Sequence, residues 1–209
     1  MVDGQLRPNR VTNGQLLAAI GELPRERFLP EAARAVAYSD EDVPLGKGRY
    51  LMEPRVLARL IQALQPQPDD RALIVASGRG YGAALLARLV KTVTAVESDP
   101  TLASAAQQIV KELGLGNIEQ TVGPLEQGAQ AGSPYDLILI EGAVQLVPKA
   151  VFDQLAEGGR LATTVAGAPG ALGVAQLYVK EGGVTSGRPL FDAATPSLPG
   201  FAPPPRFTF

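Results

Sequence analysis

Apolar and polar positions change their spacing near residue 71 of the chain. Before that point, apolar residues recur at helical spacing in short segments that Gly and Pro interrupt. After it, short apolar runs alternate with segments of helical period. Strands that are apolar on both faces and alternate with helices indicate a parallel sheet covered by helices. The sequence therefore predicts an α/β fold over residues 71–209, behind a helical and loop cover over residues 1–70, in one compact unit.

The expected cover contains three helices and one long loop. Apolar spacing over residues 11–21 predicts a short helix capped by Thr12 or Asn13. A Pro-bounded turn and a short helix through Arg34 follow. The Gly/Pro-punctuated residues 40–54 are expected to form a loop with little regular structure. Pro54 suits the first turn of a third helix, which the apolar stripe after it continues.

The expected sheet domain alternates strands with helices. Strands are predicted over residues 71–77, 91–98, 117–123, 135–143 and 160–167, and helices over residues 80–90, 101–116 and 148–159. Residues 173–180 and the final 206–209 are candidates for late edge strands. The stretch from Gly182 to Pro205 shows neither period and is expected to wrap the surface.

Composition narrows the chemistry. The 209 residues contain neither cysteine nor histidine, which removes thiol nucleophiles, imidazole bases and the usual zinc sites, so no metal is predicted. The net charge of −2 and the scattered basic residues do not predict nucleic-acid binding. No signal peptide or apolar run of about 18 residues is recognisable, which predicts a cytoplasmic protein without membrane attachment.

A glycine-rich turn follows the first expected strand. Gly78, Gly80 and Gly82 would let a ligand approach the backbone closely, and Glu97, 19 residues after Gly78, could accept hydrogen bonds from ribose hydroxyls. The turn also satisfies G-x-G-x-x-A, the pattern of dinucleotide folds. The structural alternative is a tight strand-to-helix turn, with Glu97 capping the next helix. The 70-residue segment before the turn favours an S-adenosylmethionine fold over an NAD-dependent enzyme.

Several segments together resemble the protein-L-isoaspartate O-methyltransferase family. The similar segments run in order over about residues 1–165, and the last 40 residues match less clearly. They are MVDGQL at the start, LPRERFLP (23–30), AYSDEDVPLGKG (37–48), SGRGYGAALLA (77–87), SPYDLILIEGA (133–143) and PKAVFDQLAEGGRL (148–161).

The resemblance implies a Rossmann-like class I methyltransferase fold with a seven-stranded sheet and S-adenosyl-L-methionine as cofactor. It implies methylation of the free carboxylate of isoaspartyl residues in damaged proteins, which would be the partners. That carboxylate is ionised at pH 7, so transfer needs positioning and exclusion of water more than acid–base help. The cofactor-binding positions it implies, together with those expected from the glycine turn and the strand ends, are Ala76, Ser77, Gly78, Arg79, Gly80, Tyr81, Glu97, Gly123 and Glu141.

The chain departs from the family pattern at several polar positions. Ile74 replaces an acid, Ala76 replaces a glycine, and Arg79 stands where a small residue is usual. Pro124 replaces the acid of a G-D-G motif, and Met52 replaces the serine of the loop G-Q-T-x-S-x-P. Two lost carboxylates would weaken cofactor binding by about two or more orders of magnitude. A catalytically silent domain that binds a partner or nucleoside metabolite is therefore the rival hypothesis.

Remaining candidates have a functional and a structural interpretation. Arg79 could meet the methionine carboxylate of the cofactor or block the cleft by pairing with Glu97. Arg49 and Tyr50 could grip a substrate carboxylate or form an ordinary loop salt bridge. Tyr81 could pack on the cofactor or be structural. Glu141 ends the fourth expected strand, where it could replace a lost acid or lie solvated.

Overall fold

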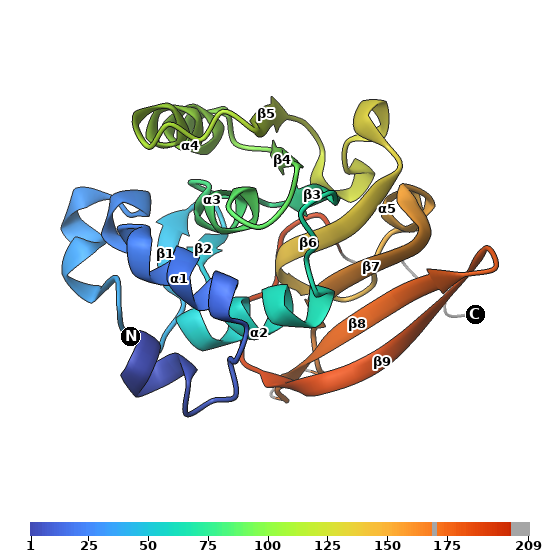
Figure 1. The fold of residues 1–209 in the computed structure, drawn as a ribbon, viewed down its shortest axis with the longest axis horizontal. Coiled ribbons are helices and arrows are strands. Elements are labelled where there is room, and N and C mark those ends of the chain that lie inside the picture. Colours follow the sequence, from blue (N-terminus) through green and yellow to red (C-terminus); the bar gives the residue numbers. More distant parts are fainter. Residues whose placement is uncertain (169–170, 202–209) are drawn as a thin grey trace, which may run out of the picture.

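The computed structural model describes residues 1–168 and 171–201, and its centre is a seven-stranded sheet (Figure 1). The strand order is β5-β4-β3-β6-β7-β8-β9, and β5 to β7 run parallel while β8 and β9 are antiparallel. This arrangement confirms the predicted mostly parallel sheet. The strands are β3 (Arg71–Val75), β4 (Thr92–Glu97), β5 (Ile118–Val122), β6 (Tyr135–Val144), β7 (Leu155–Val165), β8 (Gly173–Glu181) and β9 (Val184–Ala193).

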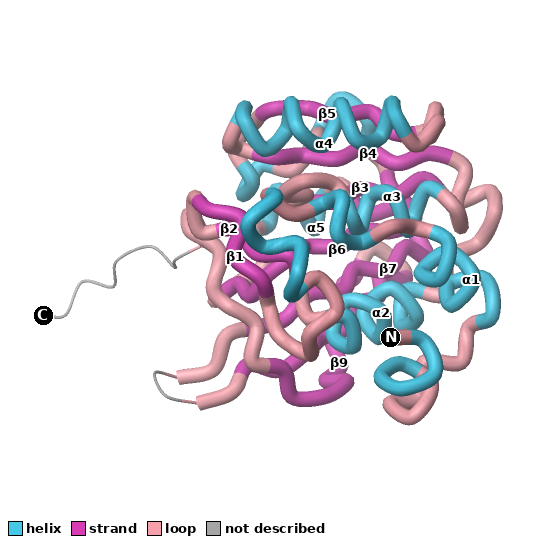
Figure 2. Tube along the Cα trace, turned by 90° about the vertical axis from the view of Figure 1, so that its left-hand side faces the viewer, coloured by secondary structure: helices cyan, strands magenta, loops and turns pink. Residues whose placement is uncertain are grey.

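In the described part of the chain, five α-helices accompany the sheet: α1 (Gly14–Glu22), α2 (Pro54–Leu64), α3 (Tyr81–Ala87), α4 (Pro100–Glu112) and α5 (Lys149–Asp153). Their starts follow the sequence signals. The side chain of Asn13 accepts from the backbone N–H of Leu16 and caps α1, and Pro54 is the first residue of α2. Figure 2 shows α4 alongside β4 and β5 at one edge of the sheet.

The segment before α2 contains more regular structure than expected. Beside the short helical turns η1 (Val2–Leu6), η2 (Arg25–Phe28) and η3 (Glu31–Val36), it holds an antiparallel hairpin of β1 (Val43–Gly46) and β2 (Arg49–Leu51). The prediction of an irregular loop over residues 40–54 is therefore wrong. Val43 and Leu51 are paired and both buried, and residues 46–48 all have positive φ, which reverses the chain.

The core lies on both faces of the sheet. Alternate residues of β3 point to opposite sides, so Ala72 and Ile74 belong to one apolar cluster and Leu73 and Val75 to the other. The first cluster also takes in most of the buried side chains that come before residue 71, Phe28 among them. The N-terminal segment is therefore packed against one face of the sheet.

The C-terminal part also differs from the sequence expectation. Residues 184–193, expected to wrap the surface without regular structure, form β9, which pairs with β8. Its Pro189 is compatible with an edge strand, where one N–H needs no partner. The helix expected over residues 148–159 is only α5, because β7 already begins at Leu155. The strand expected over residues 206–209 lies outside the described residues.

None of the described helices is long and apolar enough to cross a membrane.

Candidate functional site

The glycine-rich turn links the end of β3 to α3 at the carboxyl edge of the sheet. Ala76, Gly78 and Gly80 all have positive φ, of 63°, 55° and 90°. At two of these positions a side chain would also be crowded: a Cβ on Gly78 would lie 2.9 Å from Leu45 Cδ1 of the hairpin, and one on Gly80 3.2 Å from Ala106 Cβ of α4. The turn therefore lies close to both the hairpin and α4.

Glu97, the last residue of β4, is fully buried beside this turn. Its Oε2 accepts a hydrogen bond from the Gly78 N–H at 2.9 Å. Its Oε1 accepts from the N–H groups of Ser98 and Asp99 at 2.7 and 3.0 Å. The structural alternative for Glu97 is wrong, because Asp99 is the residue that caps α4. The carboxylate instead joins the strand end to the turn.

Arg49 of β2 reaches into the same place. Its Nε lies 3.1 and 3.2 Å from the two carboxylate oxygens of Glu97, and its Nη2 donates to Ser98 Oγ at 2.8 Å. Nη1 is buried without a hydrogen-bond partner among the described residues. The expectation that Arg79 blocks the cleft by pairing with Glu97 is wrong, because Arg49 forms that ion pair. Arg79 lies on the other side of the turn, facing α4.

A second buried arginine lies next to the start of α3. Arg25 donates from Nε to the Ala37 carbonyl at 2.7 Å and from Nη2 to the Met52 carbonyl at 2.6 Å. Its guanidinium lies 4.8 Å from the centroid of the Tyr81 ring, which also packs edge-on against Phe28. Burial lowers the pKa of Arg25 and raises that of Tyr81. These contacts hold the N-terminal segment against the turn and α3.

Glu141 differs from its sequence expectation. The strand β6 continues to Val144, with a register shift against β7 between Leu139 and Ala143, so Glu141 does not end it. The side chain is buried rather than solvated, and Oε1 has no partner among the described residues. Burial raises the pKa of Glu141 to about 8; Arg25 opposes this rise and Glu97 adds to it. At pH 7 the carboxyl is mainly protonated.

The absence of a side chain at Gly82 makes this position of Glu141 possible. A Cβ on Gly82 would lie 1.6 Å from Glu141 Oε1. The carboxyl group therefore occupies the space beside the first turn of α3 that any other residue would fill.

The other predicted positions have mainly structural contacts. Met52 is buried in the core, and Tyr50 is half-buried on β2 opposite Pro44. The Ser77 N–H donates to the Val96 carbonyl at 3.1 Å, and Ser77 Oγ accepts from Gln120 Nε2 at 3.2 Å.

Gly123 also lies at this edge. The Gly123 N–H donates to the Glu97 carbonyl at 3.1 Å, which joins the ends of β4 and β5. Sequence reasoning missed Arg25, although it stands within the segment LPRERFLP.

The polar groups at this edge are of the types that bind an adenosine-containing cofactor. A buried carboxylate and the backbone amides of a glycine-rich turn are the groups that hold a ribose in nucleotide-binding sheets. The buried atoms without partners among the described residues include Arg49 Nη1, Tyr81 Oη and Glu141 Oε1, which surround the turn. Unpaired buried polar atoms are rare and point to a polar ligand or ordered water. In this conformation, however, Arg49 Nε already donates to both oxygens of the Glu97 carboxylate.

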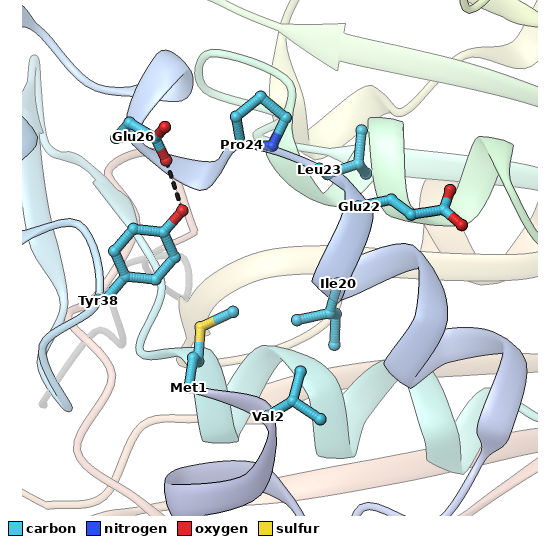
Figure 3. Close-up of a pocket in the computed structure, with 9 residues that line it drawn as sticks. Met1, Val2, Ile20, Glu22, Leu23, Pro24, Glu26 and Tyr38 are labelled. Carbon is cyan, nitrogen blue, oxygen red and sulfur yellow. Dashed lines mark hydrogen bonds between the residues drawn. The ribbon is translucent and has the colours of Figure 1, made fainter.

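A cavity of about 390 Å³ lies elsewhere, on the N-terminal segment (Figure 3). Met1, Ile20, Pro24 and Tyr38 contribute to its wall, and the Tyr38 hydroxyl donates to Glu26 beside it. Its walls include neither Glu97 nor any residue of the glycine turn. The candidate site is therefore assigned to the sheet edge, because ligands of α/β sheets gather at the carboxyl ends of the strands.

Comparisons with known proteins identify a single family. The family model of protein-L-isoaspartate(D-aspartate) O-methyltransferase matches residues 2–190. The chain is 39% identical over 157 residues to the protein-L-isoaspartate O-methyltransferase of Roseiflexus sp. (strain RS-1), covering 75% of this chain and 72% of that protein. It is 37% identical over 161 residues to protein-L-isoaspartate O-methyltransferase 2 of Anaeromyxobacter sp. (strain Fw109-5), covering 77% of this chain and 66% of that protein.

Solved structures show the same fold. One protein-L-isoaspartate O-methyltransferase superposes with a TM-score of 0.81 at 25% identity, covering 93% of this chain but 63% of that chain. A Plasmodium falciparum protein, described as a putative member of this class in complex with S-adenosyl-L-homocysteine, superposes with a TM-score of 0.75 at 21% identity, covering 92% and 94%. The first structure and the Anaeromyxobacter protein both extend well beyond the matched part.

Proposed function

The chain belongs to the protein-L-isoaspartate(D-aspartate) O-methyltransferase family, and from that premise we propose that it methylates the free carboxylate of isoaspartyl residues in proteins. S-adenosyl-L-methionine is the cofactor, and isoaspartyl-containing proteins or peptides are the substrates. Methyl transfer by an active enzyme is preferred over a silent binding domain and over an NAD-dependent enzyme, because the family match spans most of the chain.

The position of Glu97 is the observation that carries this proposal. Its carboxylate is buried at the end of β4 and is fixed by the Gly78 N–H of the glycine-rich turn. A carboxylate at this place can accept hydrogen bonds from both hydroxyls of the cofactor ribose. In this proposal Glu97 serves as the cofactor acid on the second strand of the nucleotide-binding unit, although Ile74 stands at the position of the family's acid on the first.

The reaction makes modest demands on the protein. When bound, S-adenosyl-L-methionine supplies a methyl group on a positively charged sulfur. A carboxylate oxygen of the substrate forms the new bond to that methyl carbon as the sulfur–carbon bond breaks, and no proton moves. The work of the chain is to position the two reactants and to exclude water, which its packed cover favours. The absence of histidine from the sequence is compatible with this chemistry.

For the cofactor ribose to bind Glu97, it must displace Arg49 from the carboxylate. Its Nε already donates to both oxygens of Glu97, and backbone N–H groups take the remaining acceptor sites of that carboxylate. Ribose hydroxyls and Arg49 therefore compete for the same acceptors. Leu45, on the same hairpin, lies against Gly78. We infer that the β1–β2 hairpin shifts when the cofactor enters.

A paired assay tests the proposed function. The enzyme is incubated with labelled S-adenosyl-L-methionine and one of two peptides that differ only in an isoaspartyl or an aspartyl residue. Methylation of the isoaspartyl peptide alone is expected. Methylation of both peptides equally, or of neither under conditions where the cofactor is shown to bind, would contradict the proposed substrate.

Calorimetric titration with S-adenosyl-L-homocysteine tests the site itself. The substitution Glu97→Gln is expected to weaken binding by about tenfold or more, because charge-assisted hydrogen bonds to the ribose are lost. Glu119→Gln is the matched control, since Glu119 is an exposed acid on the neighbouring strand β5. Equal affinities of the two variants would exclude Glu97 as the ribose acceptor.

A further inference from the structure

Three arginines meet at a small cavity outside the proposed methyl-transfer site. The cavity, of about 200 Å³, lies between α4 and the turns η2 and η3. Arg27 comes from η2, Arg34 from η3 and Arg79 from the glycine-rich turn. From α4 come Ala105, Gln108, Ile109 and Glu112. Figure 1 shows the N-terminal turns beside α4, so the folding of the cover is what brings these side chains together.

The positive charge at this cavity is only partly compensated. Glu112 is the acid among its lining residues; it pairs with Arg27 and also accepts from Gln108 Nε2 at 3.0 Å. Within residues 1–168 and 171–201, neither Arg34 nor Arg79 takes part in an ion pair. The lining therefore carries two guanidinium groups in excess of its carboxylates.

Arg79 also contributes a buried hydrogen-bond donor to this cavity. Its Nε is shielded from solvent and has no hydrogen-bond partner among the described residues. Burial, and then the positive charge of Arg34, lowers the pKa of Arg79. A buried donor without an acceptor and two uncompensated like charges are both stabilised by an anion between them.

We propose that this cavity binds a phosphate dianion, either free or as the phosphate group of a small molecule. Two charges on the ligand would balance the two unpaired guanidinium groups, and guanidinium forks match phosphate oxygens in bidentate geometry. The site is distinct from the Glu97 edge, because Glu97 is neutralised by Arg49 and Arg79 faces α4. It is independent of the proposed methyl transfer.

The test is a calorimetric titration of the full chain with inorganic phosphate, with chloride holding the ionic strength constant. Saturable binding of one phosphate is expected. Arg34→Gln and Arg79→Gln should each weaken it by about tenfold or more, the effect of losing a charge-assisted contact. Arg188→Gln, at an exposed position on β9, is the matched control and should leave the affinity unchanged. Thermal melts of all variants verify that they fold.

Other outcomes would overturn the assignment. Heat that grows linearly with phosphate, or equal affinity in the wild type and both arginine variants, would exclude a site at this cavity. Tighter binding of succinate than of phosphate would assign the cavity to dicarboxylates instead. Titration with methyl phosphate distinguishes free phosphate from the phosphate group of a small molecule. If methyl phosphate binds as tightly as inorganic phosphate or more tightly, the ligand is an esterified phosphate. If it binds more weakly, the ligand is free phosphate.

Discussion

Arg49 Nε lies between the two carboxylate oxygens of Glu97, at 3.1 and 3.2 Å, and both side chains are buried. The two residues are 48 positions apart and belong to the hairpin and to the central sheet. Removing one partner of a buried ion pair leaves an uncompensated charge, which is far more destabilising than breaking an exposed pair. The same contact covers the carboxylate that we propose as the ribose acceptor.

Replacing Arg49 should therefore have opposite effects on stability and on cofactor binding. Arg49→Gln is expected to lower the free energy of unfolding by about 3 kcal/mol, because the Glu97 charge loses its partner. S-adenosyl-L-homocysteine is expected to bind several-fold more tightly, because no guanidinium has to be displaced. Urea unfolding and calorimetric titration measure the two effects.

Arg55→Gln is the control for this experiment. Arg55 is also on the N-terminal side of the sheet domain, but its ion pair with Glu53 is partly exposed. Its loss should change stability by less than about 1 kcal/mol and leave affinity unchanged. Weaker cofactor binding in Arg49→Gln would show that Arg49 is itself a cofactor contact, not a competitor.

Glu141 should make the protein less stable as pH rises. The folded protein holds a proton on this carboxyl up to a pKa of about 8, whereas the unfolded chain releases it near the ordinary glutamate pKa of 4.5. Between these values the unfolded state binds fewer protons, so the free energy of unfolding falls with pH, by up to about 5 kcal/mol in total. The contribution is complete below pH 4.5 and is lost above pH 8.

Denaturant unfolding of the wild type and Glu141→Gln between pH 5 and 8.5 measures this dependence. The wild type should lose stability relative to the variant from pH 5 up to about pH 8, and the difference should level off above that. Asp42, whose pKa burial raises to about 6, contributes at the lower end in both proteins and cancels in the difference. Parallel curves for the two proteins would show that Glu141 titrates normally.

Gly82 and Glu141 should be energetically coupled. An added Cβ at residue 82 would collide with Glu141 Oε1, so Gly82→Ala is expected to destabilise the protein by about 1–3 kcal/mol despite the higher helix propensity of alanine. In a Glu141→Ala background the same substitution should be neutral or stabilising. A double-mutant cycle by urea unfolding measures the coupling, and additive effects would refute the contact.

Ala76 is expected to be strained. Its φ of 63° lies in the left-handed region, where an L-residue with a Cβ costs roughly 1–2 kcal/mol. Ala76→Gly should therefore raise the free energy of unfolding by about 0.5–1 kcal/mol, after the greater entropy of glycine in the unfolded chain is subtracted. Ala95→Gly, in the extended strand β4, should have the opposite sign. A loss of stability in Ala76→Gly would contradict the strain.

The sheet was predictable because its strands are locally encoded. Short β-branched and aliphatic runs between helices indicate buried parallel strands from the local sequence alone. The β1–β2 hairpin could not be predicted in this way. Pro44, Gly46 and Gly48 are typical of a loop, and the pairing of the two strands depends on packing against the glycine-rich turn. β9 was missed for a related reason: an edge strand containing Gly187 and Pro189 is specified mainly by its pairing with β8.

The individual residues of the candidate site could be predicted from the sequence, but the contacts between them could not. The spacing from Gly78 identified Glu97, and the family pattern identified Arg49 as a position of interest. That these two form an ion pair depends on how the N-terminal segment packs against the sheet, which no local pattern contains. As the end of an expected strand, Glu141 was predicted either to replace a lost acid or to lie solvated. The extension of β6 and the missing side chain of Gly82 explain why it is buried instead of solvated.

The hairpin that carries Arg49 leaves the ribosome before the strand that carries Glu97. During synthesis, a nascent chain ending before residue 97 exposes a cation with no counterpart, and only the later arrival of β4 and the Gly78 turn completes the pair. The N-terminal segment is therefore expected to remain incompletely folded until the first half of the sheet has emerged. Its acquisition of protease resistance during translation should follow, not precede, the appearance of β4.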